Sequence, residues 1–166
     1  MVIETERKFL ITDPSWKKEV RRSVHFRQGY FPLAADARTT IRVRTADSKA
    51  WLTIKGPSSG CSRQEYEYEI PYGDACELLE GPAGGRSLEK IRHYIPAGEG
   101  LVWEIDEFLG RNEGLVVAEI ELPAENTPFP HPSWLGTEVT ALPRYRNSRL
   151  VVHPWSEWSE PEKAPV

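Results

Sequence analysis

Glu4-Thr5-Glu6-Arg7-Lys8 is the stretch of sequence that decides the fold. In an extended strand, successive side chains leave opposite faces, so Glu4, Glu6 and Lys8 line one face together. Taken alone, such a run is typical of a solvated outer face, because charged residues are rarely buried without partners. The same alternation recurs in strand after strand, and this repetition favours another interpretation.

Alternation of charged and apolar residues predicts eight strands separated by short turns. They are expected at residues 3–12, 24–31, 40–45, 50–55, 63–70, 87–95, 101–109 and 115–122. Short helices are predicted from Pro14 to about Arg22, after a cap at Asp74, and from Pro143 to about Val151. The segment 154–166 has too little apolar content to demand order, so we expect one domain over residues 1–153 followed by a tail.

Composition bounds the class of protein. A length of 166 residues fits one domain with a sizeable core, and a net charge of −4 gives no general reason to expect nucleic acid as a partner. The sequence contains no long apolar run and no basic, then apolar, leader, so we expect neither a signal peptide nor a membrane partner. Cys61 and Cys76 lack metal-ligand spacing and are too few for a disulfide framework, which favours a cytoplasmic location.

The signs of the charges are segregated by strand. Like charges two residues apart share one strand face in four places, namely Arg42 with Arg44, Lys90 with Arg92, Glu104 with Asp106, and Glu119 with Glu121. A sheet that faces water with its charged side, the alternative interpretation, would mix the signs along each strand for mutual neutralisation. Because short turns favour an antiparallel sheet that closes on itself, we predict a mainly β fold: a closed eight-stranded antiparallel β-barrel with flanking helices.

Segregated charges suit a charged interior. Basic pairs suit a polyanion and acidic pairs suit divalent metal ions, and both are satisfied if the charged faces point into one tunnel that holds a phosphate chain and its metal. The apolar faces, which carry Tyr66, Tyr68, Trp103 and Ile105, would then pack outward against the helices. This is the reverse of an ordinary small barrel, whose interior is filled with apolar side chains.

These motifs together resemble the CYTH domain, or triphosphate tunnel metalloenzyme, superfamily. The matching positions are Glu4, Glu6 and Lys8; Gln28 and Tyr30; Arg42 and Arg44; Lys55 before a glycine; Arg63, Glu65 and Glu67; Lys90 and Arg92; Trp103 to Asp106; Glu119 and Glu121; and Glu138 to Thr140 with Tyr145 and Asn147. They run from Glu4 to about Leu150, so the resemblance covers nearly the whole chain.

The resemblance implies metal-dependent chemistry at a triphosphate, and the short bacterial members that it most resembles are inorganic triphosphatases. The expected enzyme is therefore a hydrolase that converts tripolyphosphate to pyrophosphate and phosphate, as a monomer or homodimer. One alternative is an organic-triphosphate enzyme, such as a thiamine triphosphatase, a nucleoside triphosphatase or a class IV adenylyl cyclase. Another is a non-catalytic polyphosphate-binding protein, although the acidic pairs argue against it.

Carboxylates are hard oxygen ligands suited to Mg²⁺ or Mn²⁺. The predicted metal ligands are Glu4, Glu6, Glu119 and Glu121, with Asp106 as a fifth candidate. Their alternative role is to pair with the tunnel's own basic side chains. Glu65, Glu67 and Glu104 are expected to hold those basic residues in place.

Guanidinium and ammonium groups grip phosphate oxygens. The predicted phosphate ligands are Arg42, Arg44, Lys55, Lys90 and Arg92, while Arg63 could join them or pair with a neighbouring acid. The resemblance implies that Lys8 and Tyr30 position or activate the attacking water, although Tyr30 could serve packing alone. The histidines, His25, His93, His131 and His153, are expected to lie at the surface or to serve packing.

Overall fold

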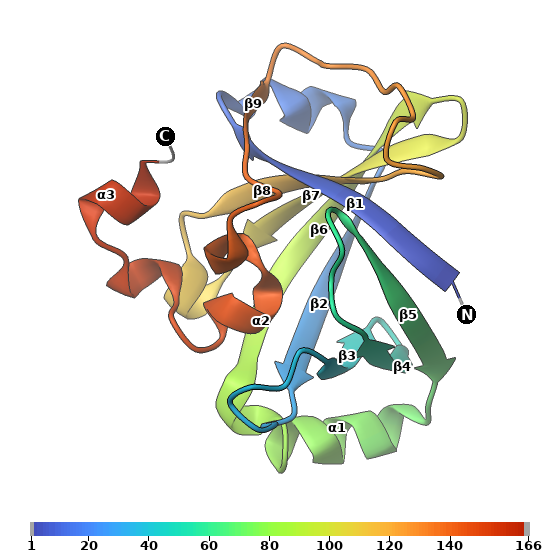
Figure 1. The fold of residues 1–166 in the computed structure, drawn as a ribbon, viewed down its shortest axis with the longest axis vertical. Helices are drawn as coiled ribbons and strands as arrows, with labels where there is room; N and C mark the ends of the chain where they lie inside the picture. Colours follow the sequence, from blue (N-terminus) through green and yellow to red (C-terminus); the bar gives the residue numbers. More distant parts are fainter. Residues whose placement is uncertain (1, 165–166) are drawn as a thin grey trace.

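The computed structural model describes residues 2–164, which form a closed antiparallel β-barrel with short helical segments around it (Figure 1). The barrel strands are β1 (Val2–Ile11), β2 (Arg22–Tyr30), β3 (Thr40–Ala46), β4 (Lys49–Lys55), β5 (Ser62–Glu69), β6 (Ser87–Gly98), β7 (Leu101–Phe108) and β8 (Val116–Glu121). Their order is β5-β4-β3-β2-β6-β7-β8-β1, and pairing of β1 with β5 closes the ring. The predicted eight-stranded barrel is therefore confirmed.

Strand β1 is the seam of the barrel. Residues 2–5 pair with β5, and residues 6–10 pair with β8. Beyond the end of the β5 pairing, Phe9 and Ile11 pair instead with a short ninth strand, β9 (Leu135–Glu138). The charged stretch at residues 4–8 thus lies where the ring closes, in contact with acidic and basic strands on either side.

Helical segments surround the barrel. They are the 3₁₀ turns η1 (Pro14–Glu19), η2 (Gly84–Arg86), η3 (Gly110–Asn112), η4 (Pro143–Tyr145) and η5 (Trp155–Glu157), and the α-helices α1 (Tyr72–Glu80), α2 (Asn147–Leu150) and α3 (Glu160–Lys163). The first predicted helix is a 3₁₀ turn that ends at Glu19, because Arg22 already begins β2. Pro71, not Asp74, precedes the first turn of α1. No helix in residues 2–164 is long and apolar enough to cross a membrane.

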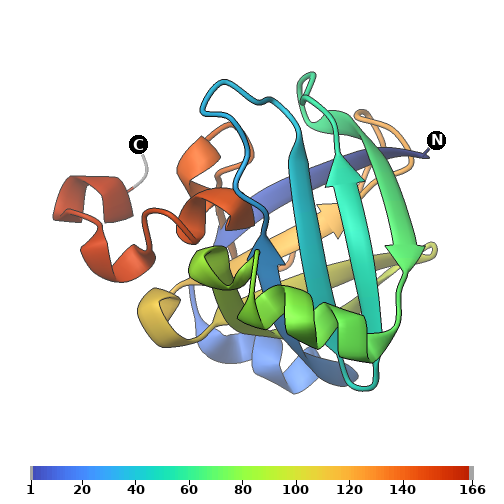
Figure 2. The ribbon, with the colours of Figure 1, turned by 90° about the horizontal axis from the view of Figure 1, so that it is seen from below.

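The outer faces of most strands are apolar, as predicted. Trp103 and Ile105 are buried in a cluster with Trp16 and Trp134, and α1 covers the outer face of β3 and β4 (Figure 2). On β2, an added Cβ at Gly29 would lie 2.6 Å from the Ala83 carbonyl oxygen, so only glycine allows this approach.

The prediction for the outer face of β5 was wrong. Tyr66 and Tyr68 are 37% and 56% exposed. The sequence pattern showed that these rings share a face, but it could not show whether a helix covers that face.

One end of the lumen is filled by an apolar core. On the inner faces, Leu88, Phe108 and Val117 lie next to the charged residues of their strands and are buried in one cluster with Tyr145 and Trp158. Segment 154–164 is therefore packed against the barrel, although its low apolar content does not by itself demand order. The physical reason is that a few large aromatic rings supply the apolar area that a residue count does not reveal.

Candidate functional site

The middle of the lumen is a charged cavity of about 200 Å³. It is lined by seven carboxylates and seven cationic side chains: Glu4, Glu6, Glu65, Glu67, Glu104, Glu119, Glu121, Lys8, Arg42, Arg44, Lys55, Arg63, Arg92 and Arg146. Every barrel strand except β2 supplies at least one charged side chain, and β2 supplies Phe26 and Tyr30. The charged faces therefore point inward, as the alternation predicted.

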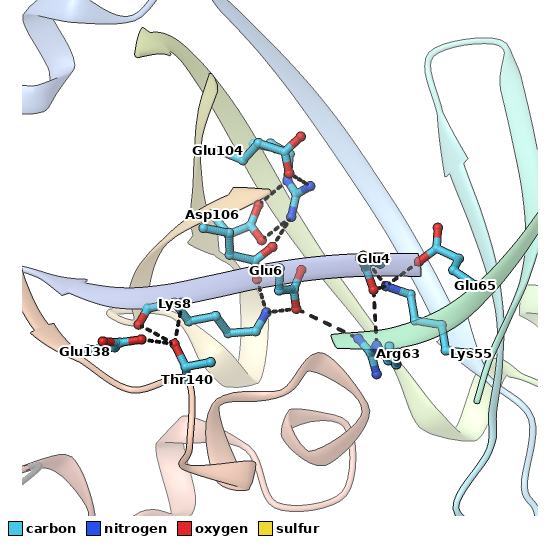
Figure 3. Close-up of polar contacts among 12 residues, drawn as sticks. Glu4, Glu6, Lys8, Lys55, Arg63, Glu65, Glu104, Asp106, Glu138 and Thr140 are labelled. Carbon is cyan, nitrogen blue, oxygen red and sulfur yellow. Dashed lines mark hydrogen bonds and ion pairs between the residues drawn. The ribbon is translucent and has the colours of Figure 1, made fainter. Parts of the chain in front are cut away.

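Lys8 lies between two carboxylates. Its Nζ is 3.0 Å from Glu6 Oε1 (Figure 3). It also forms an ion pair with Glu119, the residue directly across from it on β8. Burial alone would lower the pKa of Lys8, but the two carboxylates raise it above its ordinary value. Lys8 is consequently a permanent ammonium at neutral pH.

Glu4 is engaged by two cations. Lys55 Nζ lies 2.7 and 2.8 Å from the two oxygens of Glu4, and Arg63 Nε lies 3.1 Å from one of them (Figure 3). Lys55 also contacts Glu65 at 2.7 Å, and Arg63 reaches Glu6 at 3.8 Å. The alternative role of these acids, pairing with the tunnel's own bases, is thus realised for Glu4 and Glu6, and Arg63 pairs with acids as one alternative expected.

Arg42 and Arg44 share a single carboxylate. Nη2 of each guanidinium lies 3.3 Å from Glu67 Oε2, which also accepts a 2.8 Å hydrogen bond from Thr53. Burial, together with the neighbouring charge of Arg42, lowers the pKa of Arg44 to about 10. One negative charge serves two cations, so this wall of the lumen carries excess positive charge suited to an anion.

Asp106 and Lys90 lie beneath the cavity rather than in its lining. Both are buried at 0% and 1% exposure, and they form an ion pair with each other. Asp106 also binds Arg92 through both carboxylate oxygens, at 2.7 Å each. Two residues predicted to touch metal or phosphate are thus packed behind Arg92, at a depth that alternation cannot specify.

The acidic wall contains two unfavourable pairings. In the sheet register, Glu6 lies opposite Glu121, and Glu104 lies opposite Glu119. Like charges directly opposite on one face are destabilising. Burial raises the pKa of Glu121, and Glu4, Glu104 and the other nearby carboxylates raise it further. Within the described chain, Glu121 has no ion-pair partner.

This carboxylate environment fits a divalent cation. Among residues 2–164, no group of three or more His, Cys, Asp or Glu side chains is already gathered around a metal position. The donors are nevertheless hard oxygens, and an additional cation would relieve the repulsion at Glu121. The residues present therefore fit Mg²⁺ or Mn²⁺ by charge and ligand type.

Sequence reasoning missed Arg146. It lines the cavity beside Asn147 and Ser148, at the start of α2. The motif that contains Asn147 does not include Arg146. A single arginine at the start of a helix forms no repeating pattern, so the sequence does not distinguish it from a surface residue. The remaining predicted residue, Tyr30, does line the cavity, and its hydroxyl accepts a 3.1 Å hydrogen bond from the Gln28 amide.

The histidines lie outside the cavity. His25 is exposed beside Glu89, and His153 is exposed beside Glu162. His93 packs against Trp16, and His131 stacks on Phe129. Their predicted surface or packing roles agree with these positions.

The closed barrel and its charged lumen define the class of protein, an antiparallel sheet closed around a cavity lined by acidic and basic side chains. The CYTH domain family matches residues 2–150, and the chain belongs to this family. An inorganic triphosphatase of Acetivibrio thermocellus is 48% identical over 157 residues, 95% of this chain and 98% of that protein. An inorganic triphosphatase of Nitrosomonas europaea is 34% identical over 151 residues, 90% and 97% of the two chains.

A solved structure agrees with the sequence relationships. The crystal structure of an inorganic triphosphatase is 34% identical and covers 92% of this chain and 96% of its own, with a TM-score of 0.64. The similarity thus extends over almost the full length of both chains.

Proposed function

We propose that this protein is an inorganic triphosphatase, which hydrolyses tripolyphosphate to pyrophosphate and phosphate within the barrel lumen. The observation that carries the proposal is the division of one cavity into a wall with surplus guanidinium charge, at Arg42 and Arg44, and a wall with opposed carboxylates, at Glu6 and Glu121. A phosphate chain with its metal complements both walls. The names of the two relatives that match nearly the whole chain support the same activity.

The proposed phosphate ligands are the cations that line the cavity. Arg42, Arg44, Lys55, Arg63 and Arg92 all have nitrogen atoms at the lumen, and guanidinium groups can bind phosphate oxygens bidentately. Their acidic partners hold them in place before substrate arrives, so little side-chain ordering is needed on binding. We assign Lys90 a supporting position beneath Arg92, because it does not line the cavity.

The proposed metal ligands are Glu4, Glu6, Glu119 and Glu121. Bound there, Mg²⁺ or Mn²⁺ would neutralise charge on the phosphate oxygens. Glu121 is the strongest candidate, since it has carboxylate neighbours and no cationic partner among the described side chains. We place Asp106 with Lys90 as a supporting residue, because it is fully buried and does not line the cavity.

Lys8 is proposed to act as a cation and not as a base. An ammonium whose pKa is raised cannot accept a proton at neutral pH, but it can donate hydrogen bonds that orient a water molecule. Glu6, the more exposed of the two carboxylates beside Lys8, is the group that could accept a proton from that water. Tyr30 can donate its hydroxyl hydrogen into the cavity, since its oxygen accepts from Gln28.

Other expectations remain proposals. A cytoplasmic location is supported by the two free thiols, Cys61 and Cys76, which suit a reducing compartment. A domain at residues 1–153 followed by a C-terminal segment is supported by a family match that ends at residue 150. A monomer or homodimer is the expected state in solution.

The test is phosphate release from tripolyphosphate, ATP and thiamine triphosphate in parallel, with Mg²⁺, with Mn²⁺ and with a chelator. Metal-dependent release that is fastest on tripolyphosphate is the expected result. Preference for ATP or thiamine triphosphate would instead support an organic-triphosphate enzyme. Tight binding without release from any of the three would support a polyphosphate-binding protein.

A variant separates metal from phosphate binding. Glu6→Gln should abolish turnover while tripolyphosphate still binds, because the change removes a carboxylate and leaves the cationic wall intact. Undiminished turnover would remove Glu6 from the mechanism.

A further inference from the structure

A second cavity, of about 600 Å³, lies between loop 31–39 and α2, and we call it the vestibule. Figure 2 shows this loop over the same side of the barrel as α2. The vestibule shares residues Tyr30, Thr40, Arg63, Arg146 and Ser148 with the lumen cavity. The two cavities therefore meet at this end of the barrel.

Four arginines without acidic partners line the vestibule. They are Arg38, Arg86, Arg146 and Arg149, and no Asp or Glu side chain lines the cavity with them. In the described part of the chain, none of the four takes part in an ion pair. Hydroxyl groups of Thr39, Ser58 and Ser148 add further hydrogen-bond donors.

This arrangement differs from that of the lumen. There, every predicted cation has a carboxylate partner, as Lys55 has in Glu4 and Arg92 has in Asp106. The whole chain has a net charge of −4, so an acid-free cavity with unpaired arginines is a local excess of positive charge. Burial lowers the pKa of Arg146, and Arg63 and Arg149 lower it further, which shows that the cations repel one another.

We propose that the vestibule is a second phosphate-binding site, in which Arg38, Arg86, Arg146 and Arg149 hold a phosphate anion outside the lumen. The assignment rests on the proposed function, because a triphosphatase meets phosphate chains and releases phosphate products. The anion has two possible sources, the far end of a chain whose near end occupies the lumen, or a product that has left it. Guanidinium groups recognise both by the same bidentate geometry.

The experiment measures binding without catalysis. Pyrophosphate is titrated calorimetrically into the full chain in low-salt buffer with chelator, and we expect two classes of site. Arg86→Gln/Arg149→Gln should remove the weaker class, because it neutralises two exposed vestibule arginines. Arg42→Gln/Arg44→Gln should remove the tighter class and keep the weaker one. The weaker class should fade with added salt, since it is solvent-exposed.

A matched control neutralises the same number of charges elsewhere. Lys18 and Arg21 are exposed, precede β2 at its opposite end, and line neither cavity. Lys18→Gln/Arg21→Gln should keep both classes. Circular dichroism of each variant establishes that it is folded.

A second titration separates the two sources. If the site holds the far end of a chain, long-chain polyphosphate should bind the wild type about tenfold more tightly than tripolyphosphate, and Arg86→Gln/Arg149→Gln should erase that difference. If the site holds product, chain length should have no effect, while the weaker pyrophosphate class still disappears in that variant.

The proposal is overturned if the wild type shows a single class of pyrophosphate site, or if both classes survive in Arg86→Gln/Arg149→Gln. Failure of the proposed function shows separately, as absence of metal-dependent phosphate release, because the titrations contain no metal.

Discussion

Asp106 binds the guanidinium of Arg92 through two parallel 2.7 Å contacts, Oδ1 to Nε and Oδ2 to Nη2. Asp106 is fully buried, and Lys90 also contacts its Oδ2. Burial tends to raise the pKa of Asp106, but Arg92 and Lys90 lower it below its ordinary value. The carboxylate therefore fixes the direction of an arginine that reaches the lumen.

Replacing Asp106 by Asn should strongly destabilise the fold. The change leaves Lys90 and Arg92 with too little negative charge, and an unpaired buried charge costs about 3–5 kcal/mol. The measurement is urea unfolding at neutral pH. Glu104→Gln is the matched control, because Glu104 binds the same arginine from a side chain that is 32% exposed, and it should cost much less. Equal unfolding midpoints for Asp106→Asn and the wild type would contradict this role.

The same pair predicts an acid dependence. A carboxyl whose pKa is lowered on folding contributes stability above its unfolded pKa of about 4, and this contribution is lost as the pH falls through the folded value. Wild-type stability should thus decline more steeply with acid than that of Asp106→Asn. Parallel declines would show that other carboxylates dominate acid unfolding.

Arg44 should contribute mainly to substrate binding. Its guanidinium lies over the rings of Phe26 and Trp51, at 4.9 and 5.4 Å from their centroids, and shares Glu67 with Arg42. Arg44→Ala should raise the KM for tripolyphosphate by about 10- to 100-fold, the effect of losing a charged hydrogen bond of about 1.5–3 kcal/mol. The kcat should change less.

Two further variants test this interpretation of Arg44. Arg44→Lys should recover only part of the loss, because an ammonium lacks the planar, bidentate group. Arg27 lies on β2 but does not line the cavity, so Arg27→Ala should leave the kinetics unchanged. Unchanged KM and kcat in Arg44→Ala would place this residue outside the substrate site.

Glu121 should destabilise the metal-free protein. Its raised pKa means that the folded state disfavours the charged carboxylate above the folded pKa, and that this cost disappears as the pH falls below the unfolded value of about 4.3. In chelator at pH 7, Glu121→Gln should therefore raise the Tm by roughly 2 °C. The gain should shrink as the pH is lowered.

Added metal should stabilise the wild type more than Glu121→Gln. Mg²⁺ or Mn²⁺ should raise the Tm of the wild type more than that of Glu121→Gln, because a ligand that binds only the folded state stabilises it. Glu113→Gln is the control, since Glu113 is exposed and lies outside both cavities. Equal metal-induced shifts in wild type and Glu121→Gln would exclude Glu121 as a metal ligand.

The inward face of each strand could be predicted because its period of two is local. Glu4, Glu6 and Lys8 share a face whatever the partner strand. Which residues meet across strands depends on long-range pairing, so the opposition of Glu6 and Glu121 could not be read from either strand alone. The depth at which a side chain lies in the barrel also depends on long-range pairing. The alternation therefore predicts Asp106 at the cavity, although it lies beneath the lining.

The burial of Trp158 is another long-range contact that the local sequence pattern does not predict. Its ring is 4% exposed and lies edge to face with Tyr145, with centroids 5.0 Å apart, within the cluster that fills one end of the lumen. Trp158→Ala should cost about 3–5 kcal/mol in urea unfolding, the usual cost of emptying a buried aromatic position. Val152→Ala, at a side chain that is 56% exposed, should cost less than about 0.5 kcal/mol.

Loss of Trp158 should also weaken substrate binding at the cavity. Tyr145 immediately precedes Arg146, which lines both cavities, so loosening of this cluster should raise the KM for tripolyphosphate as well as lower the Tm. A truncation after residue 153 should reproduce both effects, since it removes the same ring. If the truncated chain unfolds at the wild-type urea concentration and keeps the wild-type KM, segment 154–164 is an appendage, and the apolar end of the lumen is stable without it.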